Sequence, residues 1–412
     1  MKTYLVGGAI RDKKLGLKVK DQDWVVVGET PESMLKKGFI PVGKSFPVFL
    51  HPKTKEEHAL ARTEKKSGKG YHGFIFNTDQ SVTLEDDLKR RDLTINAIAE
   101  DKNGNLIDPY NGLKDLKEKK LRHVSDAFSE DPLRVLRVAR FLARFKFFGF
   151  SIAPETLNLM KKITESGELT HLTPERIWQE TLLALKTDNP QCYFETLREI
   201  GALKILFPEI DQLFGIPQTK KYHPEVDCGI HLMMVLAQTA KLNLSPEARF
   251  AALVHDLGKG ITPKDILPKH IAHEHHGVPL VLAMCQRLRI PKRFETIGAL
   301  TCLYHTHCHK AFELKPYTIL KLLKDLSADK KPKQFDDFLM ACFADSRGRL
   351  GFESVDYPQV DYLKDALKAI KSISAQTYIK QGLKGKTLGN AIEQAQIKAL
   401  NEYKKDYSSI KN

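Results

Sequence analysis

The chain has 412 residues and a formal net charge of +14, from 65 Lys and Arg against 51 Asp and Glu. Hydrophobic residues make up 42% and charged residues 28%, which is typical of a globular protein and excludes a largely disordered chain. This length predicts two to four domains. The positive charge favours a polyanionic partner, nucleic acid rather than a membrane, because no basic amphipathic anchor is present.

No stretch approaches the roughly 20 consecutive apolar residues that a membrane helix needs. Met1 to Thr3 lead directly into a predicted strand rather than into a signal peptide. The six cysteines form no CxxC pair and no dense disulfide framework. We therefore expect reduced thiols and a cytoplasmic protein without membrane contact.

The first predicted ligand site lies within the first thirty residues. Residues 4–6 predict a short buried strand, and a helix is expected to start at Ala9, so Gly7 and Gly8 occupy the turn between them. Glycines let a ligand approach the backbone closely, and the free N–H groups of a helix start favour phosphate. Neither a GxGxxG nor a GxxxxGK[ST] pattern occurs at this turn, which argues against a Rossmann site or a P-loop.

An apolar, β-branched run over residues 19–27 follows, with Asp21 and Asp23 near its start. In a strand these two side chains point to the same face. Such acid pairs are often only solvated strand ends. Beside a phosphate-binding turn, however, two carboxylates suit Mg²⁺, which prefers carboxylate oxygens and substrate phosphates. Two ions about 3.5–4 Å apart would hold the attacking and leaving oxygens of a phosphoryl transfer.

Residues 1–125 predict a mixed α/β domain. A helix is expected after Thr30, which is a suitable N-cap, with Pro31 at its first position. The later predicted elements are paired strands over 46–50 and 57–62, a basic glycine-rich loop over 65–73, a helical face over 84–99 that is interrupted near Arg91 and Asp92, a turn over 101–105 and a short strand over 106–108.

From Glu130 onward the strand signals nearly vanish. A strongly amphipathic helix is predicted over 131–145, with Asp131 as N-cap and Pro132 in its first turn. Four arginines fall within a sector of about 120° on this helix, namely Arg134, Arg137, Arg140 and Arg144. In a chain that also has the acid pair Asp21 and Asp23, such a basic face favours contact with phosphates or bases. Further helices are predicted over 154–166, 174–186, 191–206 and 229–243, and a proline-rich connection over 214–225 is the expected domain boundary.

Ten of the 15 histidines lie between residues 223 and 309. His231 lies at the start of one predicted helix, and a second helix over 249–254 ends in His255 and Asp256. Imidazoles and a carboxylate from neighbouring helices suit a transition metal such as Ni²⁺, Co²⁺, Mn²⁺ or Zn²⁺. Such a metal would polarise water against a phosphate ester.

These motifs together resemble the bacterial CCA-adding enzymes, class II tRNA nucleotidyltransferases, in the version that carries an HD-type phosphohydrolase domain. The likeness covers nearly the whole chain and rests on residues 5–12 with 21–23, on 90–97 and on 130–134. It implies a palm-like α+β nucleotidyltransferase domain over 1–125, an all-α neck and body that binds nucleotide and RNA over 126–225, an all-α HD-type domain over 226–330 and a helical C-terminal region over 331–412.

The resemblance also implies the reaction, which is addition of the 3′-terminal CCA to the tRNA acceptor end from CTP and ATP. By the same resemblance, the tRNA 3′-hydroxyl would attack the nucleotide α-phosphate and release pyrophosphate, with Mg²⁺ as cofactor. The implied site residues are Asp21 and Asp23 as catalytic Mg²⁺ ligands, Gly8 and Arg11 at the triphosphate, Arg91 at the nucleotide, Asp92 and Asn96 around the sugar, Asp131 and Arg134 at the base edge, and Arg137 and Arg140 as further nucleotide contacts.

In the HD-type domain, the resemblance assigns His231, His255 and Asp256 to the first three positions for Ni²⁺ or another transition metal. His255 and Asp256 would be catalytic for 2′,3′-cyclic phosphodiesterase, 2′-nucleotidase and phosphatase activities. Relatives often carry a His-Asp pair where this chain has His305 and Thr306. His305 is the expected last ligand, and the alternatives that stay open are His307, His309 and Asp345.

Two other functions compete with this interpretation. The first is poly(A) synthesis by the same chemistry, which the chain length, the lack of an arginine-rich tail and the His-Asp domain disfavour. The second is a non-catalytic RNA-binding module, which the acid pair, the glycine turn and the base-edge motif disfavour together. The sequence leaves both a monomer and a homodimer open.

Overall fold

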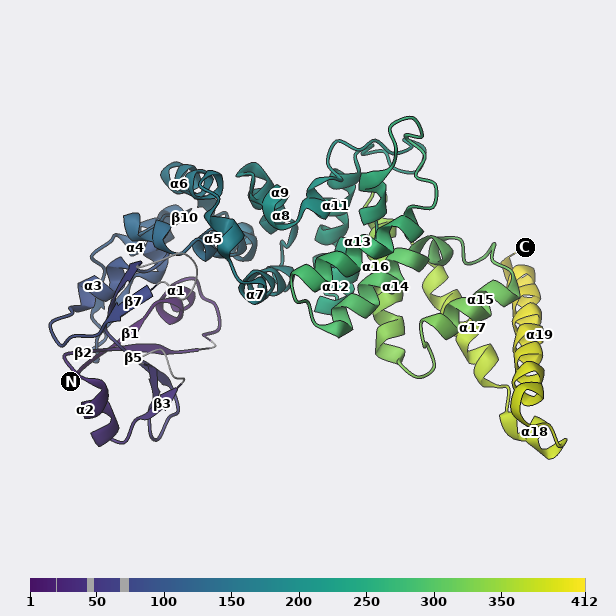
Figure 1. Ribbon diagram of the computed structural model, residues 1–412, viewed down its shortest axis with the longest axis horizontal. Coiled ribbons are helices and arrows are strands. Elements are labelled where there is room, and N and C mark those ends of the chain that lie inside the picture. Colours follow the sequence, from purple (N-terminus) through teal and green to yellow (C-terminus); the bar gives the residue numbers. More distant parts are fainter. Residues whose placement is uncertain (20, 43–47, 67–73, 412) are drawn as a thin grey trace. The chain divides into compact units, whose positions relative to one another are not determined.

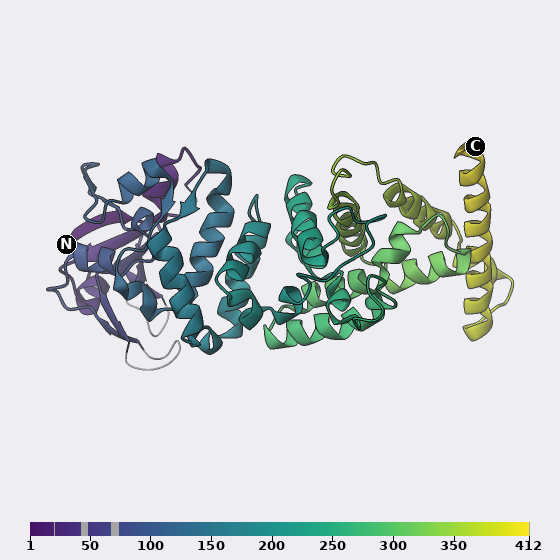
Figure 2. The same cartoon turned by 90° about the horizontal axis from the view of Figure 1, so that it is seen from above.

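The computed structural model describes residues 1–19, 21–42, 48–66 and 74–411. The predicted fold class is confirmed, because the large sheet lies in the N-terminal part and helices make up nearly all of the chain after it (Figures 1 and 2). The chain forms two compact units, unit 1 with residues 1–184 and 192–206 and unit 2 with residues 185–191 and 207–412. The finer division into four domains stays a prediction.

Unit 1 is built on a seven-stranded mixed sheet. Strand β1 (Lys2–Val6) lies inside the sheet, antiparallel to β2 (Asp23–Val27) on one side and to β8 (Ala99–Glu100) on the other. Strand β2 also pairs in parallel with β5 (Glu57–Leu60). The sheet is completed by β3 (Ile40–Val42), β4 (Val48–Leu50) and β9 (Leu106–Ile107), in the order β3-β4-β5-β2-β1-β8-β9.

Both faces of this sheet are covered, since successive strand side chains point to opposite sides. Val25 packs with Val6 and Ala99 on one face, while Val26 packs with Met34 and Leu60 on the other. Helix α1 (Gly8–Lys14) follows β1 directly, and α2 (Pro31–Lys36) begins with the predicted Thr30 cap. A second capping box, with Thr83 as N-cap, starts α3 (Leu84–Lys89).

Several predicted boundaries are wrong. Strand β2 begins at Asp23, so Asp21 precedes the strand and is not part of it. Lys65 and Lys66, which were expected in a loop over 65–73, belong to β6 (Thr63–Lys66), which pairs with β7 (Phe74–Asn77). Residues 67–73 of that loop, and Phe46 and Pro47 of the predicted strand, lie outside the described residues.

The interrupted helical face ends at Lys89 and is followed by the 3₁₀ turn η2 (Thr94–Asn96) and by β8. Helix α4 (Gly112–Glu118) and a 3₁₀ turn η3 (Asp126–Glu130) lead into α5 (Leu133–Phe145). The helix begins two residues later than predicted, with Pro132 rather than Asp131 at its N-cap. Asp131 directly precedes it, and its Oδ1 accepts the backbone N–H of Leu133. The apolar side of α5, including Leu136 and Ala139, is fully buried.

The remaining helices of unit 1 agree with the predicted helical pattern, with one correction. The expected helix over 191–206 is two helices, α8 (Gln191–Glu199) and α9 (Ala202–Leu206), because Gly201 between them has a φ of +77°. Helices α6 (Pro154–Glu165) and α7 (Pro174–Leu185) precede them, and the short strands β10 (Lys120–Leu121) and β11 (Ser151–Ile152) pair in parallel.

The described residues of unit 2 form helices and connecting segments, and none of its elements is a strand. Five helices surround the histidine-rich region: α11 (Cys228–Lys241), α12 (Pro246–Val254), α13 (His273–Arg287), α14 (Lys292–His309) and α16 (Pro332–Arg347). Four more form the C-terminal part: α15 (Pro316–Asp325), α17 (Gln359–Lys371), α18 (Ala375–Lys380) and α19 (Gly385–Lys411). The hydroxyl of Tyr403 on α19 donates to the Tyr362 carbonyl oxygen at 3.1 Å, which fixes the last helix against α17.

All six cysteines are buried, and none forms a disulfide. None of the helices within the described ranges combines the length and apolarity that crossing a membrane requires.

Candidate nucleotide and metal sites

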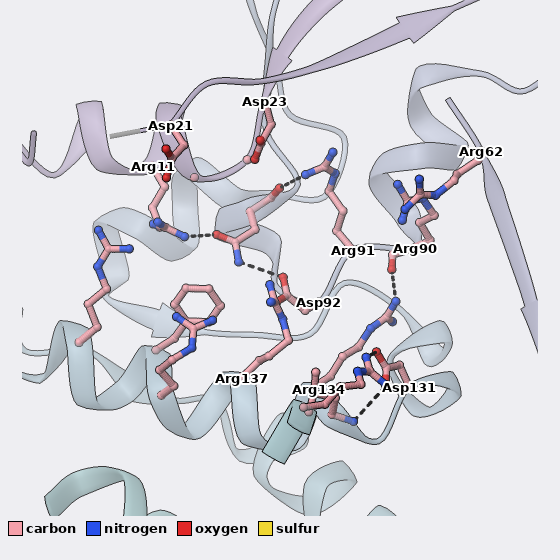
Figure 3. A pocket seen from close by; sticks show the side chains of 18 residues that line it. Arg11, Asp21, Asp23, Arg62, Arg90, Arg91, Asp92, Asp131, Arg134 and Arg137 are labelled. Carbon is pink, nitrogen blue, oxygen red and sulfur yellow. Dashed lines mark hydrogen bonds and ion pairs between the residues drawn. The ribbon is translucent and has the colours of Figure 1, made fainter. Parts of the chain in front are cut away.

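Unit 1 contains a cavity of about 670 Å³ whose wall is dominated by arginine (Figure 3). Nine arginines and four aspartates line it, so its electrostatic character is strongly positive. A triphosphate is a polyanion that such a wall would attract. The charged lining residues are Arg11, Asp21, Asp23, Arg62, Arg90, Arg91, Asp92, Asp131, Arg134, Arg137, Arg140, Arg144 and Arg176.

The predicted glycine turn forms one edge of this cavity. Gly7 has a φ of +72°, a conformation that L side chains rarely adopt, and a Cβ there would lie 2.9 Å from Arg91 Nη1. At Gly8 an added Cβ would lie 3.3 Å from Arg11 Nη2. Both glycines therefore leave room for the cavity arginines, and Gly7 also provides the turn itself.

Asp21 and Asp23 line the same cavity although Asp21 precedes the strand. Both side chains are exposed, and within the described part of the chain neither makes a hydrogen bond or an ion pair. Partial desolvation in the cavity raises the pKa of Asp23, the Arg91 charge opposes this shift, and the like charge of Asp21 adds to it. Two neighbouring carboxylates that repel each other and lack partners fit a divalent cation.

A continuous hydrogen-bond network joins three of the predicted motifs along the cavity (Figure 3). Arg11 donates to Asn96 Oδ1 at 2.5 Å, and Asn96 Nδ2 donates to Asp92 Oδ1 at 2.9 Å. Arg137 Nη2 completes it at 2.7 Å from Asp92 Oδ2. Burial alone would raise the pKa of Asp92, but Arg137 and the Asn96 hydrogen bond outweigh it and hold the pKa well below its usual value.

Three buried carboxylates that sequence reasoning missed hold other cavity arginines in place. Asp87, whose side chain is fully buried, pairs with Arg90 Nη2 at 2.7 Å and with Arg91 Nη2 at 3.2 Å. Glu180 pairs with Arg140, and Asp12 pairs with Arg144 at 2.7 Å. The arginines are thus preorganised before any phosphate arrives, which reduces the entropy cost of binding.

Asp131 and Arg134, the predicted base-edge pair, lie together at the start of α5 (Figure 3). The Arg134 guanidinium donates to the backbone carbonyl of Ala127 at 2.6 Å and to that of Arg90 at 2.5 Å. Asp131 Oδ2 accepts from Arg176 at 2.7 Å. Both side chains therefore have fixed orientations, and they offer an acceptor next to a donor.

Unit 2 contains a second site, with three groups of possible metal ligands among the described residues; one joins His223 and Glu225 to His231, and the other two are fully buried and adjacent. In the first buried group, Asp345 Oδ1 lies 3.0 Å from His231 Nε2 and 3.5 Å from His255 Nε2. In the second, Asp256 Oδ1 lies 3.3 Å from His273 Nε2 and 3.4 Å from His305 Nε2. The two buried groups are adjacent because Asp256 Oδ2 is only 3.1 Å from His255 Nε2.

Backbone carbonyls orient the imidazoles of this cluster. The Nδ1 atoms of His255, His273 and His305 lie 2.7 Å, 2.9 Å and 3.0 Å from carbonyl oxygens three residues earlier in the chain. If these contacts hold the proton on Nδ1, each Nε2 is left as a free lone pair that faces the other ligands.

His231 has a carboxylate partner in addition to a carbonyl. Its Nδ1 lies 3.0 Å from the Gly348 oxygen and 3.1 Å from Glu225 Oε1. Burial raises the pKa of Glu225, but its contacts with His223 and His231 outweigh burial and bring the pKa below its usual value. The Glu225 side chain is therefore a buried anion in contact with His231, one of the predicted metal ligands.

The donor set fits a bound cation. Two buried atoms at the centre of the cluster, His255 Nε2 and Asp256 Oδ1, make no hydrogen bond among the described residues. Burial disfavours a charged His255, but Asp256 and Asp345 outweigh it and raise its pKa to about 10. The site thus attracts positive charge, and imidazole with carboxylate ligands is a set that transition metals accept. It opens into a cavity of about 850 Å³ that Lys259, Lys269, Lys310 and Arg349 also line.

Comparison with known proteins places both sites in one family. Three family models match: Poly A polymerase head domain over residues 3–122, probable RNA and SrmB-binding site of polymerase A over 149–214, and HD domain over 229–328. The chain is 55% identical to the multifunctional CCA protein of Hahella chejuensis, over 98% of this chain and 96% of that protein. It is also 55% identical to that of Acinetobacter baumannii, over 100% and 99%. The chain belongs to the multifunctional CCA protein family.

The fold of this multifunctional CCA family member is similar to that of solved CCA-adding enzymes. An apo form matches 100% of this chain and 92% of that one, with a TM-score of 0.65 and 22% identity. The Thermotoga maritima CCA-adding enzyme complexed with tRNA CCA matches the same shares, with a TM-score of 0.63 and 20% identity. At these identities the likeness establishes the fold.

All predicted nucleotide-site residues line the arginine-rich cavity of unit 1, and Asp21 and Asp23 also line a neighbouring cavity beside β4 and β5. The predicted metal residues of unit 2 lie in one cluster. Within that cluster His305 is grouped with Asp256, whereas His231 and His255 are grouped with Asp345. His309 contacts the other Asp345 oxygen at 2.7 Å. His273 was not among the predicted ligands; its place at the start of α13, the next α-helix after the His-Asp segment, was the available signal.

Proposed function

We propose that this chain adds and repairs the 3′-terminal CCA of tRNA, using CTP and ATP without a nucleic-acid template. The observation that carries the proposal is the cavity in which two unpartnered carboxylates face nine arginines. Family membership supports it. CCA-adding enzymes of the same fold have been solved in complex with CTP, with ATP and with tRNA CCA.

In the proposed reaction, the tRNA 3′-oxygen forms a bond to the α-phosphorus while the bond to the β-phosphate oxygen breaks and pyrophosphate leaves. Asp21 and Asp23 would hold Mg²⁺, which supplies the charge that favours the 3′-alkoxide and neutralises the departing pyrophosphate. Arg11 and Arg91 lie beside the glycine turn and would bind the triphosphate. Asp92 and Asn96, fixed by their network, would shape the sugar pocket.

The base would be selected by Asp131 and Arg134. Cytosine and adenine both present an amino group beside an unprotonated ring nitrogen, which match an acceptor and a donor respectively. Uracil and guanine present the reverse, a carbonyl beside a ring N–H. Because unmatched polar groups in a desolvated site are costly, the pair would reject uracil and guanine.

For unit 2 we propose a metal-dependent phosphohydrolase that acts on 2′,3′-cyclic phosphate and 2′-phosphate ends, with Ni²⁺ or another transition metal. The groups His231–His255–Asp345 and Asp256–His273–His305 could each hold one cation. Such a metal would activate water and polarise the phosphate ester. The basic residues around the cavity would hold the phosphate.

The tRNA acceptor arm is proposed to lie along the basic helical region that follows Arg140. Binding through phosphates predicts an affinity that falls steeply as salt rises, since each contact releases counterions. Filter binding of tRNA between about 50 and 200 mM salt measures this slope, and salt-independent binding would contradict the proposed contact mode.

The decisive experiment incubates the purified protein with tRNA that lacks its CCA end, together with Mg²⁺, CTP and ATP. Addition of C, C and A followed by a stop is the expected result. A long ladder of A would instead indicate poly(A) synthesis. No incorporation would return Asp21 and Asp23 to a purely structural interpretation.

A further inference from the structure

Two arginines of the nucleotide cavity, Arg62 and Arg176, lie outside every motif recognised in the sequence, and Arg176 contacts the predicted base-edge pair. Arg176 is in the first turn of α7, and its Nη2 is 2.7 Å from Asp131 Oδ2. The other Asp131 oxygen, Oδ1, accepts the backbone N–H of Leu133 at 3.1 Å. Each oxygen of the carboxylate thus has a separate partner, one from α7 and one from α5.

We propose that Arg176 is a positioning residue for nucleotide choice, which orients the Asp131 carboxylate so that it presents fixed acceptors to the edge of the incoming base. This inference rests on the proposed function of the cavity and on the base-edge role of Asp131 within it. It assigns a part in specificity to a residue 45 positions beyond the aspartate that it contacts.

The physical reason is the freedom of an aspartate side chain. The torsion that turns a carboxylate is broad, so the plane of an unrestrained group is poorly defined. A planar guanidinium restricts this rotation, because a charge-assisted N–H···O bond is both short and directional. With its plane fixed, Asp131 would accept from the amino group of cytosine or adenine, and its lone pairs would repel the carbonyl oxygen of uracil or guanine.

The two halves of the base-edge pair are held independently. Arg134 is oriented by the carbonyl oxygens of Ala127 and Arg90, and neither of these contacts involves Arg176. Loss of Arg176 should therefore weaken only the acceptor half. We expect the errors to be uracil in place of cytosine and guanine in place of adenine, because these pairs differ at the position that Asp131 reads.

The test compares Arg176→Ala with the wild-type protein on tRNA lacking its CCA end, using kcat/KM for each of the four nucleotides. The expected result is that UTP relative to CTP, and GTP relative to ATP, each rise at least tenfold, while CTP turnover falls by less. Arg176→Lys keeps the charge without the planar fork and should give an intermediate ratio.

Arg122→Ala is the matched control, since Arg122 pairs with Asp115 at 3.1 Å in the same unit but does not line the cavity. It should leave both ratios unchanged. Unchanged ratios in Arg176→Ala, or an equal loss for all four nucleotides, would overturn the inference. If a thermal melt shows that Arg176→Ala is not folded, the same nucleotide ratios are measured for Arg176→Lys and Arg176→Gln instead.

The wild-type reaction separates this inference from the proposed function. If the wild-type protein adds C, C and A and stops while the Arg176 variants keep full discrimination, the function stands and the inference fails. If the wild-type protein adds no nucleotide, the proposed function itself fails, and the inference fails with it.

Discussion

The two candidate sites differ in where their carboxylates lie and in what those carboxylates contact. In unit 1, buried carboxylates such as Asp87 and Glu180 pair with arginines. Among the described acids that line the cavity, Asp21 and Asp23 are the two without a hydrogen bond or ion pair, and both are exposed. In unit 2, the carboxylates Asp256 and Asp345 are themselves at the buried centre, surrounded by imidazoles. The first arrangement suits a cation that arrives with a triphosphate, and the second suits a resident metal.

The largest expected effect is on nucleotide addition alone, without an effect on the activity of unit 2. Asp21→Ala or Asp23→Ala should lower nucleotide addition by more than about a hundredfold, because charge stabilisation of the transferring phosphate would be lost. Phosphatase activity of unit 2 should persist. Incorporation of labelled CTP measures the effect, and Gln22→Ala, an exposed residue between the two acids, is the control. Comparable activity in all three variants would remove the acid pair from the mechanism.

The reciprocal change should leave CCA addition intact. Asp345→Asn removes the carboxylate shared by His231 and His255, so binding of Ni²⁺ should be lost. At a metal concentration of 100 times Kd, binding stabilises a folded protein by about 2.7 kcal/mol. The measurement is the metal-induced rise in melting temperature, which chelator should abolish in the wild-type protein. A variant that keeps the full rise would exclude Asp345 as a ligand.

A smaller and more selective effect is expected at Arg134. Arg134→Ala removes the donor half of the base-edge pair, so selectivity for CTP and ATP should fall more than total turnover. Competition between all four nucleotides, with sequencing of the products, gives both quantities. Loss of all activity with unchanged selectivity would mean that Arg134 has no role in reading the base.

The smallest expected effect is on the metal affinity of unit 2, and it tests the contribution of Glu225. Glu225→Gln keeps the shape of the side chain but removes the charge behind His231, and such a change typically costs about tenfold in metal affinity. Calorimetric titration with Ni²⁺ measures it. Glu313→Gln is the matched control, because Glu313 lines the same cavity and is exposed. Equal affinity in both variants would limit Glu225 to a structural role.

The residues predicted for the nucleotide site line one cavity, and their motifs are local in the sequence. Gly7 and Gly8 could be found from turn chemistry. Arg11, Arg91, Asp92 and Asn96 were implied by the family resemblance, whose motifs are short enough to be recognised in the sequence. What could not be predicted is how the arginines are held. Asp87 and Glu180 look like ordinary surface acids of amphipathic helices, and only tertiary packing reveals that they are buried.

The metal cluster was harder for a related reason. Its ligands come from four helices and the segment between two of them, and no spacing rule connects His231 with Asp345, which are 114 residues apart. The sequence contained ten histidines in one region, more than one site needs. Burial separates them, since His231, His255, His273 and His305 are buried whereas His275 and His276 are exposed. The start of β2 was misplaced because an apolar run does not mark where pairing with β1 begins.

The network along the nucleotide cavity has a direction. Donation runs from Arg11 to the Asn96 oxygen and from the Asn96 nitrogen to Asp92, and Arg137 donates to Asp92 from the opposite side. The Asn96 amide therefore cannot be turned over without setting donor against donor and acceptor against acceptor. Among side chains of this size, only asparagine both accepts and donates in this way. The orientation of the Asn96 amide therefore connects Arg11 on α1, through Asp92, to Arg137 on α5.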